Sequence, residues 1–204
     1  MLGTVLTPVR APDDLALAQR CVARDRTAQR ELFDRELPRV YAILHRVLGA
    51  SGAIDDLVQD AFLEIFRSLR NFRGESSLGT WIDRCTVRVA YAHLTQKRRR
   101  GPVLEVVSDL ASGHPNAEAR AMAREAVRRL YAELDRMDPV PRLAFTLHAI
   151  DGRSLEEVAR LMEASLDATK SRVWRARQAL EARARRDPLL ADFLRTDTES
   201  EEPA

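Results

Sequence analysis

The sequence predicts an all-α protein of two small helical domains joined by a flexible linker, the C-terminal domain being a helix-turn-helix. Hydrophobic residues make up 45% of the 204 residues but aromatic residues only 5%. Leu, Val and Ala must therefore build the core, and this composition favours helices. Apolar residues recur at helical spacing, and no strand-like alternation runs longer than a few residues. Residues 101–116 are rich in Pro, Gly and Ser and separate two helical stretches.

The charges are unevenly distributed along the chain. The formal net charge is only +2, but residues 187–204 hold six acids and one base, and the rest of the chain has a net charge of +7. A basic body with an acidic tail indicates a polyanionic partner. We expect five parts: a flexible N-terminal arm (1–12), a first domain (13–100), a linker (101–116), a second domain (117–186) and an acidic C-terminal tail (187–204).

Several classes of protein are disfavoured by the sequence. No apolar run approaches the roughly 20 residues that a transmembrane helix needs. The first basic residue, Arg10, follows the apolar start, unlike the basic start of a secretory signal. Two cysteines, Cys21 and Cys85, make no disulfide framework, and the four histidines lie too far apart for a zinc site. We expect a cytoplasmic protein without membrane insertion, metal or cofactor.

The first domain is predicted to contain four helices. Asp13 is a candidate N-cap for the first helix, and Pro38 is expected to break or kink the second. The predicted helices span 15–24, 28–48, 54–71 and 81–97, with a turn at 49–52 and a loop at 72–80.

The helix predicted at 54–71 has two contrasting faces. Seven apolar residues share one broad face: Leu57, Val58, Ala61, Phe62, Ile65, Phe66 and Leu69. The opposite face carries Asp56, Gln59, Asp60, Leu63 and Arg67. A leucine amid acids and amides is typical of a docking patch, but single exposed leucines are also normal on protein surfaces. The residues alone leave both interpretations open.

The loop at 72–80 and the helix after it combine an aromatic side chain with cations. Trp81 follows a Gly- and Ser-rich segment, and the helix then collects Arg84, Arg88 and the basic run 97–100. Aromatic rings beside cations suit unstacked bases of single-stranded nucleic acid. A lone tryptophan at the start of a helix is more commonly a core residue, so the basic run is the stronger half of this signal.

The second domain has the layout of a helix-turn-helix. A helix is expected at 117–137, and Pro139 and Pro141 fit the first turn of a short helix ending at Gly152. Ser154 and Glu157 form a capping box for a helix that ends near Met162. After a three-residue turn, Ser165 caps a basic helix at 166–186.

The last helix indicates DNA binding. Its buried stripe is predicted to be Leu166, Thr169, Val173, Ala176 and Leu180, with Ser171, Trp174, Arg175 and Gln178 opposite and Lys170 and Arg172 at the flanks. Residues 166–186 hold seven bases and two acids. A solvated amphipathic helix would not explain an exposed tryptophan among cations, whereas docking in a DNA groove would.

Four sequence motifs resemble one known family. The run Asp-Asp-Leu-Val-Gln-Asp-Ala-Phe at 55–62 and the run Phe-Arg-Gly-Glu-Ser-Ser-Leu-Gly-Thr-Trp at 72–81 resemble region 2 of the extracytoplasmic-function (ECF) sigma factors of bacterial RNA polymerase. The run Ser-Leu-Glu-Glu-Val-Ala at 154–159 and the run Thr-Lys-Ser-Arg-Val-Trp-Arg-Ala-Arg at 169–177 are similar to region 4 of the same family. The resemblance covers 13–100 and 117–186 in the family's order.

This resemblance implies roles for individual residues. Contact with the clamp helices of the largest polymerase subunit falls to Asp56, Gln59, Asp60 and Leu63. Melting of the −10 element and capture of a single-stranded base falls to Phe72, Arg73, Gly74, Glu75, Ser76, Ser77, Trp81, Arg84, Arg88, Lys97 and Arg98. Reading of the −35 element in the major groove falls to Lys170, Ser171, Arg172, Trp174, Arg175 and Arg177. The implied partners are core RNA polymerase, promoter DNA and an anti-sigma factor, with a monomer when free of them.

The sequence departs from the family pattern at three places. Val87-Arg88 stands where the family often has Arg-Asn, and Thr169 stands where a buried valine is common. The turn before the last helix, 162–164, lacks the common glycine, so we expect a backbone conformation that alanine tolerates.

Three other functions remain as alternatives. A dimeric helix-turn-helix repressor or activator would explain the C-terminal half and would need symmetric half-sites but no polymerase. An enzyme is disfavoured, because the adjacent acids Asp55-Asp56 and Glu156-Glu157 point to different sides of a helix and no nucleophile or phosphate loop accompanies them. A protein-interaction adaptor would leave the basic helix without a use.

Overall fold

A computed structural model describes residues 11–100, 117–185, 187–188 and 191. The predicted linker, most of the predicted arm and most of the acidic tail lie outside the described residues. The chain divides into two compact units. Unit 1 falls within Met1–Leu44 and Ala53–Ala90, and unit 2 falls within His45–Gly52 and Tyr91–Ala204.

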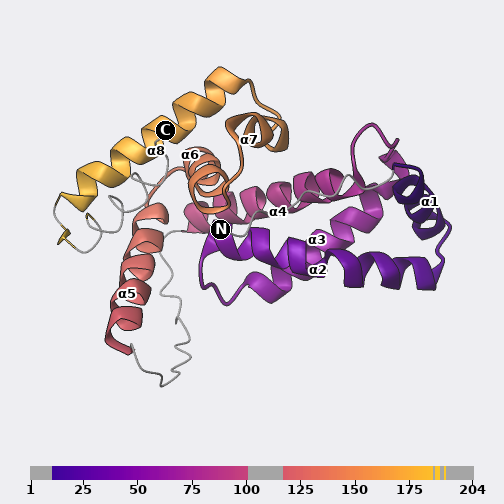
Figure 1. Ribbon diagram of the computed structural model, residues 1–204, viewed down its shortest axis with the longest axis horizontal. Coiled ribbons are helices and arrows are strands. Elements are labelled where there is room, and N and C mark those ends of the chain that lie inside the picture. The colour runs from indigo at the N-terminus through magenta and orange to yellow at the C-terminus, as the bar shows by residue number, and fades with distance from the viewer. Residues whose placement is uncertain (1–10, 101–116, 186, 189–190, 192–204) are drawn as a thin grey trace. The chain divides into compact units, whose positions relative to one another are not determined.

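The all-α prediction is confirmed, since every regular element among the described residues is a helix (Figure 1). None of these helices has the length and apolar character needed to cross a membrane. The elements are α1 (Ala11–Val22), α2 (Arg26–Leu48), α3 (Ile54–Ser68), the 3₁₀ turn η1 (Leu69–Asn71), α4 (Leu78–Arg100), α5 (Ala117–Leu134), α6 (Pro139–Phe145), the π-helical turn η2 (Thr146–Ile150), α7 (Leu155–Leu161) and α8 (Leu166–Ala184).

The core of unit 1 is aliphatic, as the low aromatic content predicts. Leu32 and Val40 of α2, Ile65 of α3, and Leu78 and Ile82 of α4 are fully buried. The apolar face of α3 packs inward as predicted, and the ring of its residue Phe62 lies 4.5 Å from that of Phe33. Burial of such side chains, about 1.5–3 kcal/mol each, is what holds these helices together.

The first two helices begin earlier than predicted. Helix α1 starts at Ala11, so Asp13 lies within its first turn and is not the N-cap. Asp25 begins α2, because its Oδ1 accepts hydrogen bonds from the backbone N–H groups of Thr27 and Ala28 at 2.8 and 3.1 Å. Of the break or kink predicted at Pro38, the break is wrong, since α2 runs continuously through this residue. Proline removes one helical hydrogen bond and its ring crowds the carbonyl four residues earlier, at a cost of about 3 kcal/mol. The burial of α2 side chains such as Leu32 and Val40 can offset this cost.

The loop between α3 and α4 is shorter than predicted. Helix α4 begins at Leu78 rather than Trp81 and continues through Arg100, so the loop comprises residues 72–77. Its early start has a local cause: the Ser77 hydroxyl oxygen accepts a hydrogen bond from the Thr80 N–H at 3.2 Å. We refer to this segment as the 72–77 loop.

Unit 2 places α8 against α6 and α7 (Figure 1). Its core joins Leu130 and Leu134 of α5 to Phe145 of α6 and to Ala176 and Leu180 of α8. Pro139 occupies the first turn of α6, as predicted. The helical segment that follows ends at Ile150 rather than at the predicted Gly152, and Gly152, two residues later, has the left-handed φ of 71° that favours glycine.

The caps of the helix-turn-helix are confirmed. The Ser154 Oγ accepts from the Glu157 N–H at 3.2 Å, and the Glu157 carboxylate accepts from the Ser154 N–H at 2.9 Å. Ser165 caps α8 through the Ala168 N–H at 3.2 Å. The expectation for the turn is wrong, because Glu163 adopts a left-handed φ of 51°. The Ala164 N–H donates to the Ala159 carbonyl at 2.9 Å and closes the end of α7, an arrangement in which the residue before Ala164 takes a left-handed conformation.

Candidate nucleic-acid interface

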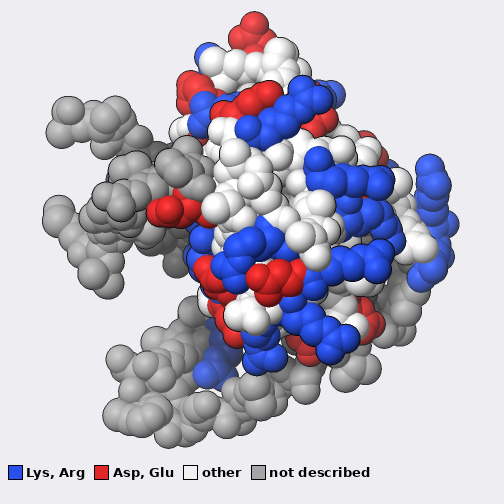
Figure 2. Space-filling view, turned by 90° about the vertical axis from the view of Figure 1, so that its right-hand side faces the viewer, with Lys and Arg blue, Asp and Glu red and all other residues white. Residues whose placement is uncertain are grey.

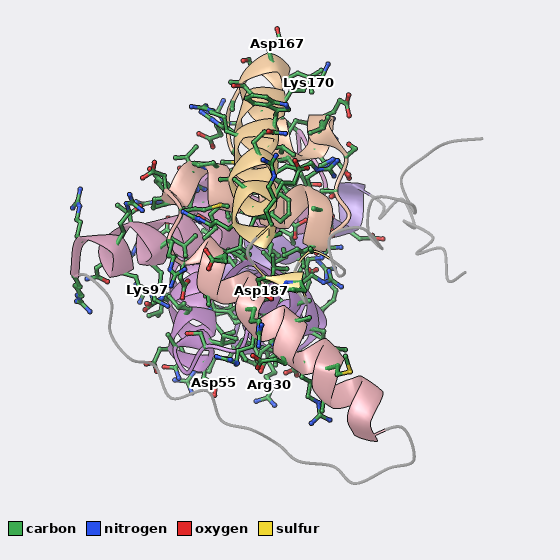
Figure 3. The ribbon with its side chains drawn as sticks, turned by 90° about the vertical axis from the view of Figure 1, so that its left-hand side faces the viewer. Arg30, Asp55, Lys97, Asp167, Lys170 and Asp187 are labelled. Atoms are coloured by element: carbon green, nitrogen blue, oxygen red, sulfur yellow. The ribbon has the colours of Figure 1, made fainter. Side chains whose placement is uncertain are left out.

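Helix α8 presents the face that its periodicity predicts. Thr169, Val173, Ala176 and Leu180 are buried, and Leu166, predicted for the same stripe, is half-buried. Lys170, Ser171, Trp174 and Arg175 are exposed together, with Trp174 63% exposed, while Arg172 and Arg177 are half-buried at the flanks. Asp167 and Lys170 lie at the N-terminal end of the helix (Figure 3). We call Lys170, Ser171, Trp174 and Arg175 the reading face.

One contact within α8 orients part of the reading face. The Arg175 Nε donates to the Ser171 carbonyl oxygen at 3.3 Å, one turn earlier. This bond uses only one of the five guanidinium N–H donors, so the terminal nitrogens remain available for an incoming acceptor. Thr169 below is fixed by its hydroxyl, which donates to the Ser165 carbonyl at 3.0 Å.

Helix α3 carries a second exposed surface. Its residues Asp56, Gln59 and Asp60 are exposed, and Leu63 is 61% exposed among them. The first turn of the helix also contains Asp55. Two carboxylates, an amide and an apolar side chain on a rigid helix suit a protein partner with a basic rim around a small apolar pocket. We call Asp56, Gln59, Asp60 and Leu63 the docking face.

An aromatic pair links the first residue of the 72–77 loop to the first turn of α4. The Phe72 ring is 7% exposed and meets Trp81 edge-to-face, with the ring centroids 5.7 Å apart. Arg73 and Glu75 are exposed, whereas Gly74, Ser76 and Ser77 are half-buried. Of the residues expected to contact single-stranded DNA, Phe72 therefore lies in the interior and packs against the half-buried Trp81.

Two buried nitrogen atoms, one in Trp81 and one in Arg84, need an explanation. Trp81 Nε1 and Arg84 Nε have no hydrogen-bond partner among the described residues. A buried donor without an acceptor is costly, about 1–3 kcal/mol. Both residues are half-buried as a whole, so each keeps part of its surface accessible.

The basic run at the end of α4 is only partly available. Lys97 Nζ lies 3.2 Å from the Asp135 carboxylate, and Arg98 lies 2.8 Å from the Asp138 carboxylate, all within unit 2. Arg88, earlier in α4, is exposed. The acidic partners stand about 40 positions away in sequence, which no local pattern signals. Figure 2 shows Lys and Arg side chains in several groups on the face it presents, with Asp and Glu between them.

Two stretches of the chain match known protein families. Residues 32–100 match Sigma-70 region 2, and residues 127–180 match Sigma-70 region 4. The chain is 30% identical over 177 residues to the ECF RNA polymerase sigma-E factor of Escherichia coli K12, covering 82% of this chain and 92% of that protein. It is 29% identical over 177 residues to the protein of the same name from Haemophilus influenzae, covering 82% and 93%.

Two solved structures share the fold. One is CnrH in complex with the cytosolic domain of CnrY, with a TM-score of 0.59 and 24% identity over 87% of this chain and 99% of that chain. The other is the sigma factor RpoE in complex with the anti-sigma factor NepR from Bartonella quintana, with a TM-score of 0.54 and 21% identity over 78% and 97%. From its two matched regions and its relatives at 30% identity, the chain belongs to the ECF family of sigma-70 RNA polymerase sigma factors.

Proposed function

We propose that the two units divide promoter recognition between them, unit 2 reading duplex DNA and unit 1 holding core polymerase and the opened strand. The observation that carries this proposal is the reading face of α8. It gathers a lysine, a serine, a tryptophan and an arginine on one exposed surface, while the opposite side of the helix is anchored in the core. No core role accounts for a tryptophan that is 63% exposed.

The reading face suits the −35 element as duplex DNA. An α-helix fits the major groove, which is about 12 Å wide. Arg175 and Lys170 can donate to guanine edges, and the Trp174 ring can contact a thymine methyl group. Arg172 and Arg177 lie at the flanks of the helix, where side chains meet phosphates and set the register without reading sequence.

The 72–77 loop suits the −10 element as a single strand. Arg73 and Glu75 are its exposed side chains, and a backbone with glycine at position 74 can approach a base closely. Extraction of a base costs a few kcal/mol, and a pocket with several polar partners can offset this. Arg84 and Arg88 on the adjoining helix would then contact the phosphate backbone of the same strand.

The docking face of α3 is proposed to bind core polymerase, and the protein itself to carry out no catalysis. The binding partners named with the two solved structures support a further expectation. A protein regulator of the anti-sigma kind would act by covering the docking face or the reading face. It would thereby compete with polymerase or with promoter DNA.

Co-migration with core RNA polymerase tests this proposal. The wild-type protein should elute with core enzyme at micromolar concentration and direct transcription from a subset of promoter fragments. It should bind free duplex DNA only weakly, because neither unit alone fixes the spacing between two promoter elements. A protein that binds duplex half-sites as a dimer and ignores core enzyme would instead be a conventional helix-turn-helix regulator.

A further inference from the structure

Unit 1 contains five charged side chains joined in one chain of ion pairs. The carboxylates of Asp14, Glu36 and Asp83 come from α1, α2 and α4, and their residues are 1%, 6% and 2% exposed. Two arginines of α2 link them: Arg35 lies 3.3 Å from Asp14 and 2.8 Å from Glu36, and Arg39 lies 3.3 Å from Glu36 and 3.1 Å from Asp83. Buried carboxylates are tolerated when paired in this way, so the chain of ion pairs ties three helices together.

Asp14 has a second partner beyond these ion pairs. The backbone N–H of Leu78, the first residue of α4, donates to Asp14 Oδ2 at 2.8 Å in a buried hydrogen bond. The first N–H groups of a helix have no partner inside the helix, and its N-terminus favours negative charge. Ser77 satisfies the Thr80 N–H locally. Asp14 therefore completes the cap of α4 from another helix, 64 positions earlier in the sequence.

Helix α1 also supports the 72–77 loop at two other points. It packs against η1, where the loop begins. A Cβ added to Gly74, in the middle of the loop, would lie 4.0 Å from the Leu15 side chain. Helix α1 thus packs against η1 just before the loop, brings Leu15 near the middle of the loop and, through Asp14, fixes the backbone just after it.

We propose that Asp14 is a positioning residue for strand opening. It fixes Leu78 at the start of α4. It thereby orients the 72–77 loop before Leu78, and Trp81 three residues after it, toward the single-stranded promoter DNA. This inference rests on the proposed function of the loop. A binding constellation works only when it is held within about 0.5 Å of its productive geometry, which a buried charge-assisted hydrogen bond to a backbone N–H can secure.

Asp14→Ala and Asp14→Asn in the full-length protein separate positioning from stability. Each variant is bound to core polymerase on a promoter that the wild type selects, and permanganate reactivity of thymines near the start site reports strand opening. The same promoter with a pre-melted bubble is the second template. Asp13→Asn, exposed in the same turn of α1, is the matched control, and Ile43→Val, in the core of α2, is a stability control.

Asp14→Ala should reduce opening of the duplex promoter at least about tenfold, because the Leu78 N–H loses a charged acceptor. Asp14→Asn keeps an oxygen that can accept this bond but loses the charge, so we expect a loss of about two- to fivefold. Both variants should bind core polymerase and transcribe the bubble template like the wild type. Asp13→Asn and Ile43→Val should open the duplex normally at a temperature where thermal unfolding shows every variant to be folded.

The proposal is overturned if duplex opening by Asp14→Ala falls no further than opening by Ile43→Val. Equal failure on duplex and bubble would also overturn it, since the defect would then lie elsewhere than in melting. If Asp14→Ala does not fold, the comparison of Asp14→Asn with Ile43→Val decides by the same criterion. Failure of the proposed function would look different, because the wild type itself would then open no duplex and would not bind core enzyme.

Discussion

The reading face of α8 and the 72–77 loop present their aromatic side chains in opposite ways. Trp174 stands 63% exposed on a helix whose other side is anchored in the core of unit 2. Phe72 is buried beneath the loop against the half-buried Trp81. Duplex DNA can be read by a rigid surface that is complete before binding. A separated strand has no fixed shape, so the protein must supply a loop whose backbone is anchored by buried side chains.

A charge reversal on the docking face should have the largest effect and should leave the reading face untouched. Asp60→Arg places a cation where we expect a basic partner surface, and like charges in an interface cost several kcal/mol, so affinity for core polymerase should fall on the order of 100-fold. Because Asp60 is exposed, the thermal midpoint should not change. Titration of labelled core enzyme measures the affinity.

Asp34→Arg is the control for that experiment, since Asp34 is exposed on α2 and pairs only with Arg30 among the described contacts. It should bind core enzyme normally. An Asp60→Arg protein that unfolds would mean that the helix face is a structural surface rather than a docking site.

Substitutions on α8 should separate base reading from phosphate contact. Arg175→Ala should lose about 1–3 kcal/mol of discrimination at one position of the −35 element, because the exposed guanidinium is proposed to contact a base. Arg172→Ala should weaken all sequences alike and reduce the slope of log affinity against log salt concentration by about one unit. Holoenzyme binding to a set of single-base promoter variants at several salt concentrations measures both. An equal loss of discrimination in the two variants would contradict the assignment of base reading to Arg175 and phosphate contact to Arg172.

Replacement of Glu75 and Ser76 by alanine should affect the 72–77 loop and leave the reading face of α8 unchanged. Ser77 must be kept, because its hydroxyl caps α4. Loss of two polar side chains should reduce strand opening about tenfold and leave core binding and closed-complex formation intact. Permanganate reactivity on duplex promoter DNA reports opening, and a pre-melted bubble should restore transcription. Equal failure on both templates would show that the loop is structural or contacts polymerase.

Loss of the local cap should have a smaller effect, confined to the start of α4. Ser77→Ala removes the acceptor for the Thr80 N–H, which costs about 1 kcal/mol in a typical helix cap. Amide hydrogen exchange at Thr80 should accelerate by about fivefold while core amides of α3 keep their protection. Unchanged exchange at Thr80 would mean that Asp14 alone secures the helix start.

The smallest effect is expected in the turn of the helix-turn-helix. Glu163 holds a left-handed φ of 51°, a conformation that disfavours non-glycine residues by about 1–2 kcal/mol. Glu163→Gly removes this strain but gives the unfolded chain more freedom, so the net gain should be about 0.5 kcal/mol. Thermal unfolding should show a midpoint raised by a few degrees. A lowered midpoint would mean that the Glu163 side chain stabilises the turn.

Features set by neighbouring residues could be predicted from the sequence. The capping box of Ser154 and Glu157, the buried stripe of α8 and both faces of α3 depend on spacings of three or four residues, which the sequence displays directly. The capping box is confirmed, and the two helices face as predicted except that Leu166 and Phe66 are only half-buried. The N-cap predicted at Asp13, also a local feature, is wrong. The roles assigned to these surfaces and the domain boundaries stay predictions.

Features set by distant residues could not be predicted. The start of α4 depends on Asp14 in addition to the local Ser77 cap, and the pairing of Lys97 and Arg98 depends on Asp135 and Asp138. These partners come into contact only in the folded chain. The sequence does not show which group a given acidic residue will bind. The left-handed Glu163 was missed although its cause is local: the Ala164 N–H donates to the Ala159 carbonyl at the end of α7, and in this helix ending the residue before Ala164 is left-handed even where it is not glycine.

The most direct test of the division between the two units is transcription from a randomised promoter library. Core polymerase is combined with the wild type, with Arg175→Ala, or with alanine at Glu75 and Ser76, and the selected promoters are sequenced. The wild type should select two separated elements, Arg175→Ala should relax only the upstream element, and the loop variant only the downstream one. Relaxation of the same element by both variants, or no transcription that depends on the wild-type protein, would contradict the account.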